Sequence, residues 1–552
     1  MTIRPPRSRL RLAAVVLTAA ATFAGGLTVA TLAGTAEAAL TSTVEDEGAD
    51  CPVPALPDAG ALPTNAKLPD PFKRLDGSRI ATKSDWRCRR EEVKRLAEKF
   101  VYGEKPAKPQ SVTGTVSSTG VAVNVTHNGR SSSFSARVEL PGGTGPFPAV
   151  VVLGGFGADT AAIKAAGAAV ISYDPYAVGK EGTPRTNKQG AFYSIYGATS
   201  STGLLMAWAW GVSRIIDVVA QSDGRILKAD AMGVTGCSRF GKGAFVVGAF
   251  DQRIALTMPI ESGSAGVPIF RGIPGEGAQS LSSAYGEQPW LGDAFGTFTG
   301  NPNRLPVDTH EMVAMVAPRG LFVMDNPHIA NLGPRSASVA ALGGAEVYKA
   351  LGAGANITYW SDVQDGTHCA NRPEWRTPLQ QHIAKYLLRT GNEPGAIRIS
   401  SRALGRLSDW SDWQTPVLAD GESPSPSRSV SPSASVSPSV SVSPSASASP
   451  SGPVSPPPGQ GCTAVATVQN AWDGGFVASV RVTAGAAPMS GWSVRLALPN
   501  GAITNLWNGR LSGTTVTNAT WNGALGAGAS TEFGFQGTGS ATGLAATGCT
   551  AA

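Results

Sequence analysis

The chain has 552 residues, and only 15% of them are charged, well below the roughly 25% of a typical globular protein. The net charge of +6 falls to +3 without the first 38 residues, and no dense run of lysine or arginine occurs, which argues against a nucleic-acid-binding protein. This length allows three or four domains, and the 67 glycines and 40 prolines indicate linker or loop-rich β structure.

Residues 1–38 have the pattern of a secretory signal peptide. Four arginines at positions 4 to 11 precede an apolar stretch over 12–33, and Ala36-Glu37-Ala38 is a small-residue cleavage pattern. A membrane anchor is the alternative, but the stretch is rich in alanine, glycine and threonine. No later segment approaches the ~18 uninterrupted apolar residues of a membrane span. We therefore expect a secreted, extracellular protein that does not remain in the membrane.

Export makes the six cysteines informative. An even number of cysteines in an oxidising compartment indicates disulfide bonds, although their pairing does not follow from the count. No C-x-x-C pair occurs, which argues against a structural zinc site, and we expect neither a metal nor another cofactor. The cysteines stand at positions 51, 88, 237, 369, 462 and 549.

Short apolar runs alternate with apolar helical segments between residues 40 and 415. Helices are expected within 203–220 and 242–250. This alternation indicates a parallel sheet covered by helices on both faces, and therefore an α/β domain. The runs expected to be buried strands are 148–153, 168–172, 231–235, 254–258, 320–324 and 357–360.

A nucleophile-elbow layout follows the third of these strands. Gly233-Val-Thr-Gly-Cys-Ser-Arg-Phe-Gly-Lys-Gly243 leads from the strand through Ser238 directly into a helix. Small residues allow the tight turn, and the helix N-terminus faces a developing anion. The second glycine falls one residue later than in G-x-S-x-G, so a phosphate-binding or purely structural turn is the alternative.

A nucleophilic serine needs a base and an acid that orients the base. His368 follows the last expected strand and precedes a terminal helix, which is the position of the base in the order Ser, acid, His of α/β-hydrolases. Glu261 and Asp325 each follow a strand, and either could orient the imidazole. Spacing alone favours Asp325, and either carboxylate could instead be a loop cap or an ion-pair partner.

Residues 423–458 divide the chain. Sixteen of these 36 residues are serine and ten are proline, a composition that cannot form a packed core. We expect an extended, partly polyproline-like linker between a large domain over 40–415 and a small module over 461–552.

The small module is predicted to be a β-sandwich. Segments 476–482 and 492–498 alternate with period two, and turn residues separate them. Four tryptophans with only five charged residues indicate a binding module, because exposed indoles stack on the apolar faces of sugar rings. Trp492 lies in an alternating strand and is expected in the core. Exposed, turn-like positions are expected for Trp472, Trp507 and Trp521.

This module resembles a family 2 carbohydrate-binding module of the cellulose-binding type. The resemblance rests on Asn470-Ala-Trp-Asp-Gly-Gly-Phe476, Asn505-Leu-Trp-Asn508, Thr520-Trp-Asn522 and Glu532-Phe-Gly-Phe-Gln-Gly537, together with the terminal cysteines. It implies that Trp472, Trp507 and Trp521 form one flat face that binds crystalline cellulose.

The large domain resembles carbohydrate esterase family 15, the glucuronoyl esterases, over about residues 50–395. This resemblance implies a three-layer α/β-hydrolase and a serine esterase. The expected substrate is the ester between (4-O-methyl-)glucuronic acid side chains of xylan and lignin alcohols. The stretches that carry the resemblance are 190–197, 207–217, 236–244, 261–264, 286–295, 325–329 and 367–369.

The resemblance also implies roles for individual residues. Ser238 would be the nucleophile, His368 the base and Glu261 the acid, which leaves Asp325 at most an auxiliary role. Arg239 would contribute to the oxyanion site, with an ion pair at the helix N-terminus as the alternative. The residues that match contacts to the hydroxyls of the uronic sugar are Lys242, Gln279 and Glu287.

The expected disulfides follow from these roles. Cys237 and Cys369 adjoin the nucleophile and the base, so a bond between them would hold the two together. Cys462–Cys549 would close the small module, which leaves Cys51–Cys88. The sequence departs from the fungal members at Ala330-Asn331-Leu332, where they carry a tryptophan, and it lacks the cysteines of their third disulfide near positions 268 and 340.

Two other functions remain open on the sequence. One is an acetyl xylan or feruloyl esterase on the same fold, and the other is a catalytically inactive wall-binding protein. In each case we expect a monomer that binds neither nucleic acid nor membrane.

Overall fold

The computed structural model describes residues 42–420, 461–472, 474–519 and 522–552. The chain divides into two compact units, 1–429 and 430–552, and each is described by itself. The expected signal peptide (1–38) and linker (423–458) lie outside the described residues.

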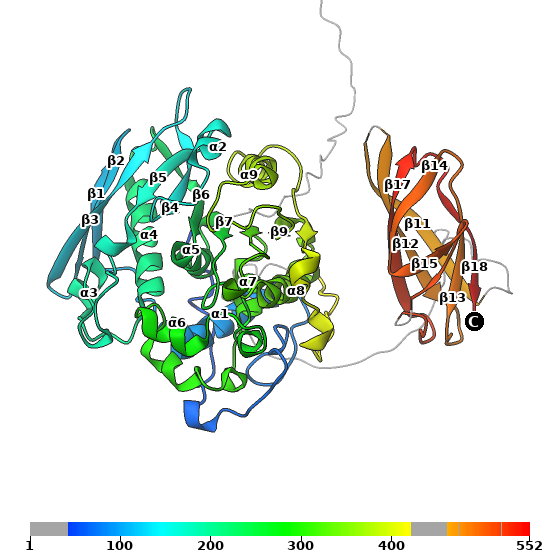
Figure 1. Ribbon diagram of the computed structural model, residues 1–552, viewed down its shortest axis with the longest axis horizontal. Coiled ribbons are helices and arrows are strands. Elements are labelled where there is room, and N and C mark those ends of the chain that lie inside the picture. The colour runs from blue at the N-terminus through cyan, green and yellow to red at the C-terminus, as the bar shows by residue number, and fades with distance from the viewer. Residues whose placement is uncertain (1–41, 421–460, 473, 520–521) are drawn as a thin grey trace, which may run out of the picture. The chain divides into compact units, whose positions relative to one another are not determined.

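A ten-stranded mixed sheet forms the centre of the large domain (Figure 1). All six strands expected from the sequence are present. The sheet is not purely parallel, because β1, β2 and β3 add an antiparallel edge. In sheet order the strands are β1 Ser111–Val116, β2 Gly120–His127, β3 Arg130–Glu139, β5 Ala169–Tyr173, β4 Phe147–Leu153, β6 Leu227–Cys237, β7 Ile254–Ile260, β8 Gly320–Met324, β9 Ile357–Trp360 and β10 Ile397–Arg398.

Helices cover both faces of this sheet, as an α/β-hydrolase sandwich requires (Figure 1). Along β4, Val150 and Val152 pack with α2 and α9, whereas Val151 and Leu153 belong to the larger core on the opposite face. This alternation gives three layers from one buried strand. One face carries α2 Thr160–Ala165 and α9 Pro373–Tyr386, and the larger core includes α1 Asp85–Ala97, α3 Ala191–Tyr196, α4 Leu204–Gln221, α5 Arg239–Phe250, α6 Leu281–Glu287, α7 Thr309–Val316 and α8 Pro334–Ala350.

Helix α4 is long and apolar enough to cross a membrane, but 89% of that stretch is buried inside the domain. It packs on α5 and β6, so its apolar character is explained by its place in the core of the domain.

A network of ion pairs links the segment that contains Glu45, near the start of the described residues, to the rest of the large domain. Glu45 pairs with Lys105 at 2.7 Å and also with Arg214 and Arg253. Burial alone would raise the pKa of Glu45, but these three cations outweigh burial and hold the pKa well below its usual value. The segment therefore stabilises the domain through charge pairing.

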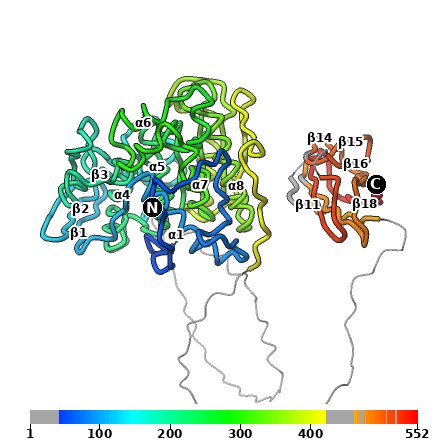
Figure 2. Tube along the Cα trace, turned by 90° about the horizontal axis from the view of Figure 1, so that it is seen from below, coloured from blue at the N-terminus to red at the C-terminus, as the bar shows by residue number. Residues whose placement is uncertain are grey.

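The small module is a sandwich of two antiparallel four-stranded sheets (Figure 2). Trp492 is buried between them, 2% exposed and stacked on Phe533, so its expected core position is confirmed. Trp521 lies outside the described residues, as do the side chains of Trp472 and Trp507. One sheet contains β11 Cys462–Trp472, β12 Gly475–Ala484, β17 Ser530–Gly539 and β14 Gly501–Trp507; the other contains β15 Gly509–Ser512, β16 Thr515–Asn518, β13 Trp492–Ala497 and β18 Ala545–Ala551.

Candidate active site

Ser238 occupies a strained turn between β6 and α5. Its backbone has φ 58° and ψ −125°, a region that non-glycine residues rarely adopt and that is found where function requires it. The flanking glycines are needed for space. A Cβ on Gly236 would lie 2.7 Å from the carbonyl oxygen of Phe240, and one on Gly241 would lie 2.4 Å from that of Ile260. Gly241, the glycine that falls one residue later than in G-x-S-x-G, therefore lets α5 pack closely against the end of β7.

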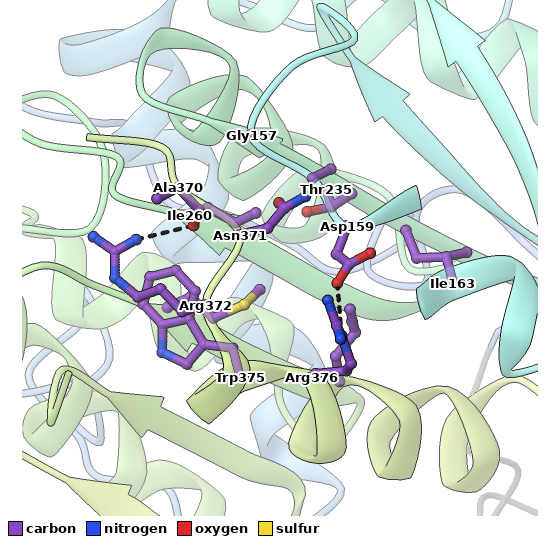
Figure 3. Close-up of a pocket in the computed structure, with 13 residues that line it drawn as sticks. Gly157, Asp159, Ile163, Thr235, Ile260, Ala370, Asn371, Arg372, Trp375 and Arg376 are labelled. Carbon is purple, nitrogen blue, oxygen red and sulfur yellow. Dashed lines mark hydrogen bonds and ion pairs between the residues drawn. The ribbon is translucent and has the colours of Figure 1, made fainter. Parts of the chain in front are cut away.

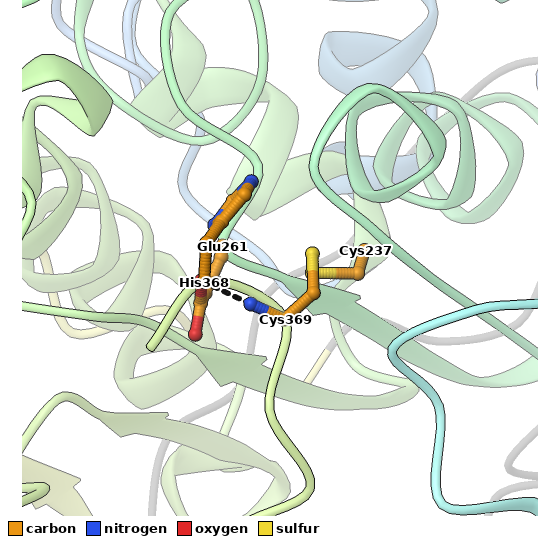
Figure 4. Close-up of side chains that lie close together, drawn as sticks. All are labelled: Cys237, Glu261, His368 and Cys369. Carbon is orange, nitrogen blue, oxygen red and sulfur yellow. Dashed lines mark hydrogen bonds and ion pairs between the residues drawn. A yellow bond between two sulfur atoms is a disulfide. The ribbon is translucent and has the colours of Figure 1, made fainter. Parts of the chain in front are cut away.

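The carboxyl ends of β6 to β9 bring the candidate triad together. These four strands are parallel neighbours, so the residues after them meet at one edge of the sheet. His368 Nδ1 lies 2.5 Å from Glu261 Oε2, and the backbone N–H of Cys369 donates to the same oxygen at 2.9 Å (Figure 4). Glu261 is fully buried, so the carboxylate that contacts the imidazole is shielded from solvent.

Asp325, the acid that spacing alone favours, points elsewhere. Its Oδ2 accepts a hydrogen bond from the Tyr359 hydroxyl at 2.9 Å, and its Oδ1 accepts one from the backbone N–H of Asn326. Burial raises the pKa of Asp325 to about 7. The carboxylate that contacts the imidazole in this structure is Glu261.

A cavity of about 270 Å³ opens at Ser238 and His368. It contains both of these residues and all four of the residues expected to contact substrate, so the predicted set converges on one site. The expected contacts are Arg239, Lys242, Gln279 and Glu287, and the remaining lining comes from Gly263, Trp290, Ile329, Asn331 and Leu332.

The polar groups in the cavity are held by specific partners. Lys242 is buried, its ammonium contacts the carbonyl oxygen of Ser262, and burial lowers its pKa to about 8. Gln279 Nε2 donates to Glu287 Oε2 at 2.7 Å. Arg239 lines the cavity and also pairs with Glu181 at 2.7 Å, so the ion-pair alternative is present alongside its place in the site.

Three residues of the site were not identified from the sequence: Glu181, Trp290 and Arg372, whose guanidinium lies 3.0 Å from Glu261 Oε1. Glu181 accepts hydrogen bonds from Arg239, the Tyr176 hydroxyl at 2.7 Å and Trp290 Nε1 at 2.5 Å, so it organises one wall. Trp290 stands in the 286–295 stretch that carries the family resemblance, which was a usable signal. Glu181 and Arg372 carry no comparable pattern, because each is defined only by contacts with residues distant in the sequence.

Comparison with known proteins agrees with this geometry. The family described as "Glucuronyl esterase, fungi" matches residues 123–352, and "Cellulose binding domain" matches residues 462–552. The 4-O-methyl-glucuronoyl methylesterase of Hypocrea jecorina is 36% identical over 378 residues, which cover 67% of this chain and 80% of that protein. The Schizophyllum commune enzyme of the same name is 35% identical, over 67% of this chain and 95% of that one. The chain belongs to the glucuronoyl esterase family.

Solved glucuronoyl esterases share its fold. The catalytic domain from Hypocrea jecorina has a TM-score of 0.62 at 35% identity and covers 66% of this chain and 100% of that one. A serine-to-alanine mutant from Sporotrichum thermophile, in complex with methyl 4-O-methyl-β-D-glucopyranuronate, has a TM-score of 0.61 at 33% identity over 67% of this chain and all of that one. The large domain is therefore an α/β-hydrolase and an esterase of this family, and the small module belongs to the cellulose-binding type.

Disulfides brace the esterase site and the module. The bonds are Cys51–Cys88, Cys237–Cys369 and Cys462–Cys549, the pairs expected from the sequence. Among the described residues, one group of potential metal ligands lies within 4.8 Å, formed by Cys237, Glu261, His368 and Cys369. Both of its sulfurs are bonded to each other (Figure 4), and its imidazole is bound to its carboxylate, so this donor set does not fit a metal.

Proposed function

We propose that this chain is a secreted serine esterase that hydrolyses esters between (4-O-methyl-)glucuronic acid side chains of xylan and lignin alcohols. The observation that carries the proposal is the convergence of Ser238, the His368–Glu261 pair and a polar cavity at one sheet edge. The substrates printed in the names of the relatives support the uronate part of this proposal.

The geometry supports a two-step acyl transfer. Because Glu261 binds Nδ1 of His368, Nε2 is the nitrogen that takes the proton as Ser238 Oγ attacks the C6 carbonyl of the uronate. The resulting oxyanion would be stabilised by N–H groups at the start of α5 and by Arg239. His368 then protonates the departing alcohol, and water attacks the acyl-enzyme to release the uronic acid and restore Ser238.

The cavity favours a sugar acid over the alternative substrates. Lys242, Gln279 and Glu287 supply donors and acceptors suited to several hydroxyl groups, and the indole of Trp290 supplies one apolar wall. An acetyl group would leave a cavity of about 270 Å³ largely unfilled. A feruloyl group would bury these polar side chains against an aromatic ring without partners, which is unfavourable.

An exposed aromatic residue, Phe156, precedes the glycine that packs against the Cys237–Cys369 disulfide. Phe156 is 47% exposed, and its ring packs edge-on against Phe240, two residues after Ser238. The next residue, Gly157, lies so close to the Cys237–Cys369 disulfide that a Cβ there would be 2.5 Å from the Cβ of Cys237 and 3.0 Å from that of Cys369. The leaving alcohol must approach His368 for protonation, so an aromatic alcohol would find an aromatic surface nearby.

The small module is proposed to hold the enzyme on crystalline cellulose through Trp472, Trp507 and Trp521. Its family match supports cellulose binding. We further propose that the protein acts as a monomer and that it works outside the cell.

One substrate panel tests the enzyme proposal. Benzyl and methyl glucuronates, methyl galacturonate, acetylated xylan and methyl ferulate are compared at equal enzyme concentration. We expect rapid hydrolysis of the two glucuronates, with the benzyl ester preferred. A higher kcat/KM on acetylated xylan or methyl ferulate would show a different esterase, and no turnover of any ester would support an inactive wall-binding protein.

A further inference from the structure

Arg372 lies next to the His368–Glu261 pair. It contacts both the Glu261 carboxylate and the loop that carries His368. This residue precedes α9, and its side chain is 1% exposed. One guanidinium nitrogen, Nη2, lies 3.0 Å from Glu261 Oε1 and donates to the carbonyl oxygen of Thr367 at 2.7 Å. Nε donates to the carbonyl oxygen of Asp365 at 3.1 Å, and Nη1 donates to that of Ala370 at 2.9 Å. One buried cation thus binds the acid and the loop on both sides of His368.

The positive charge of Arg372 lies next to the buried carboxylate of Glu261. A buried carboxylate without a counter-ion is strongly disfavoured and tends to take up a proton. A protonated acid could not accept the Nδ1–H of His368 and stabilise the imidazolium in the same way. In the part of the chain that the structure describes, Arg372 is the only arginine or lysine paired with Glu261. Arg372 therefore supplies the counter-ion of the buried carboxylate that the imidazole contacts.

The planar guanidinium group of Arg372 also holds the loop that carries His368. The segment from the end of β9 to the start of α9 contains no helix or strand, yet it carries the catalytic histidine. A guanidinium group presents its donors in a rigid plane, so three carbonyl contacts fix the segment in one arrangement. The Cζ atom of Arg372 lies 4.7 Å from the centroid of the Trp375 ring. Figure 3 shows both residues in the lining of a cavity on this side of the loop.

We propose that Arg372 is a positioning residue for the reaction, which holds the Glu261 carboxylate and the loop that carries His368 in register with each other. This inference rests on the proposed roles of Ser238, Glu261 and His368. Arg372 does not line the cavity that contains Ser238, so it acts through Glu261 and the loop and makes no contact with substrate.

The first test separates this role from substrate binding. Arg372→Met removes the charge and the fork but keeps much of the volume. We expect kcat on benzyl glucuronate to fall about 10- to 100-fold with KM changed less than about twofold. Arg372→Lys, which restores the charge without the fork, should recover part of the loss. Arg376→Met is the matched control, because Arg376 stands one turn later on α9 and pairs with Asp159 at the surface, and it should keep wild-type kcat.

The second test asks whether Arg372 acts through Glu261. In a Glu261→Gln background, Arg372→Met should cost less than about threefold, because residues that act as a unit are not additive. A full second loss in that background, wild-type kcat in Arg372→Met, or a rise in KM at constant kcat would each overturn the proposal. If Arg372→Met does not fold, Arg372→Lys decides, since wild-type kcat in that variant would contradict the need for the fork.

These outcomes stay distinct from a failure of the proposed function. Wild-type hydrolysis of benzyl glucuronate and its loss in Ser238→Ala test the enzyme assignment alone. If both hold while Arg372→Met is fully active, the esterase assignment stands and the positioning role is wrong.

Discussion

Replacing Glu261 should cost far more activity than replacing Asp325, although both carboxylates follow neighbouring strands. Glu261→Gln keeps the shape but removes the acceptor charge 2.5 Å from His368 Nδ1 and leaves buried Arg372 without its counter-ion. In triads, loss of the orienting carboxylate lowers kcat by about 10⁴-fold, equivalent to about 5 kcal/mol of transition-state stabilisation. Asp325→Asn loses one contact with Tyr359 and should lower kcat less than about tenfold.

The assay is kcat on benzyl glucuronate for both variants at neutral pH, with thermal unfolding to confirm that each is folded. Asp325→Asn serves as the matched control, because it also neutralises a buried carboxyl at the same sheet edge. A larger loss in Asp325→Asn would transfer the role of the acid to Asp325. Equal losses would refute the assignment of the imidazole partner to Glu261 alone.

Further predictions concern the ion pairs of Glu45, the exposed ring of Phe156 and the small module. Glu45→Gln should lower the free energy of unfolding by about 3 kcal/mol at pH 7, because it leaves buried Lys105 without its carboxylate partner and removes one of the partners of Arg214 and Arg253. The folded-state pKa of Glu45 lies below its ordinary value of 4.5, so the difference from wild type in urea titrations should persist above that pH and vanish as the pH falls through the folded-state pKa. A pH-independent difference would contradict this reasoning. Phe156→Ala should raise KM for the benzyl ester about threefold and leave the methyl ester unchanged, whereas equal effects on both esters would exclude a contact with the alcohol. Deletion of residues 423–552 should preserve turnover of soluble esters and lower activity on intact plant wall. Replacement of Trp472, Trp507 and Trp521 by alanine should abolish retention on cellulose. A triple variant that still sediments with cellulose would place the binding face elsewhere.

The sequence predicted the central sheet well, because buried strands leave a strong local pattern. All six expected strands of the large domain are present, and the elbow at Ser238 lies where the strand-to-helix transition placed it. The period-two alternation around Trp492 likewise predicted its burial. The antiparallel edge of β1 to β3 was not predicted, since alternation in one-sided strands indicates a sheet without revealing which strand each one joins.

The acid could not be chosen by spacing, because Glu261 and Asp325 end adjacent parallel strands. The choice depends on local backbone geometry, since Glu261 has a φ of 45° and receives the Cys369 N–H, whereas Asp325 turns toward Tyr359. The family resemblance indicated Glu261 where composition and spacing could not. Arg372 carried no sequence signal, since its role depends on carbonyl groups and a carboxylate brought together only by the fold.

The central claim is that Ser238 attacks a glucuronate ester in the cavity it shares with His368. The most direct measurement is kcat/KM on benzyl glucuronate for the wild-type protein and for Ser238→Ala, with thermal unfolding measured on both. We expect turnover by the wild type, a loss of at least about 1,000-fold in the variant and a closely similar unfolding midpoint. A folded Ser238→Ala protein that retains more than about a thousandth of wild-type activity would contradict this assignment.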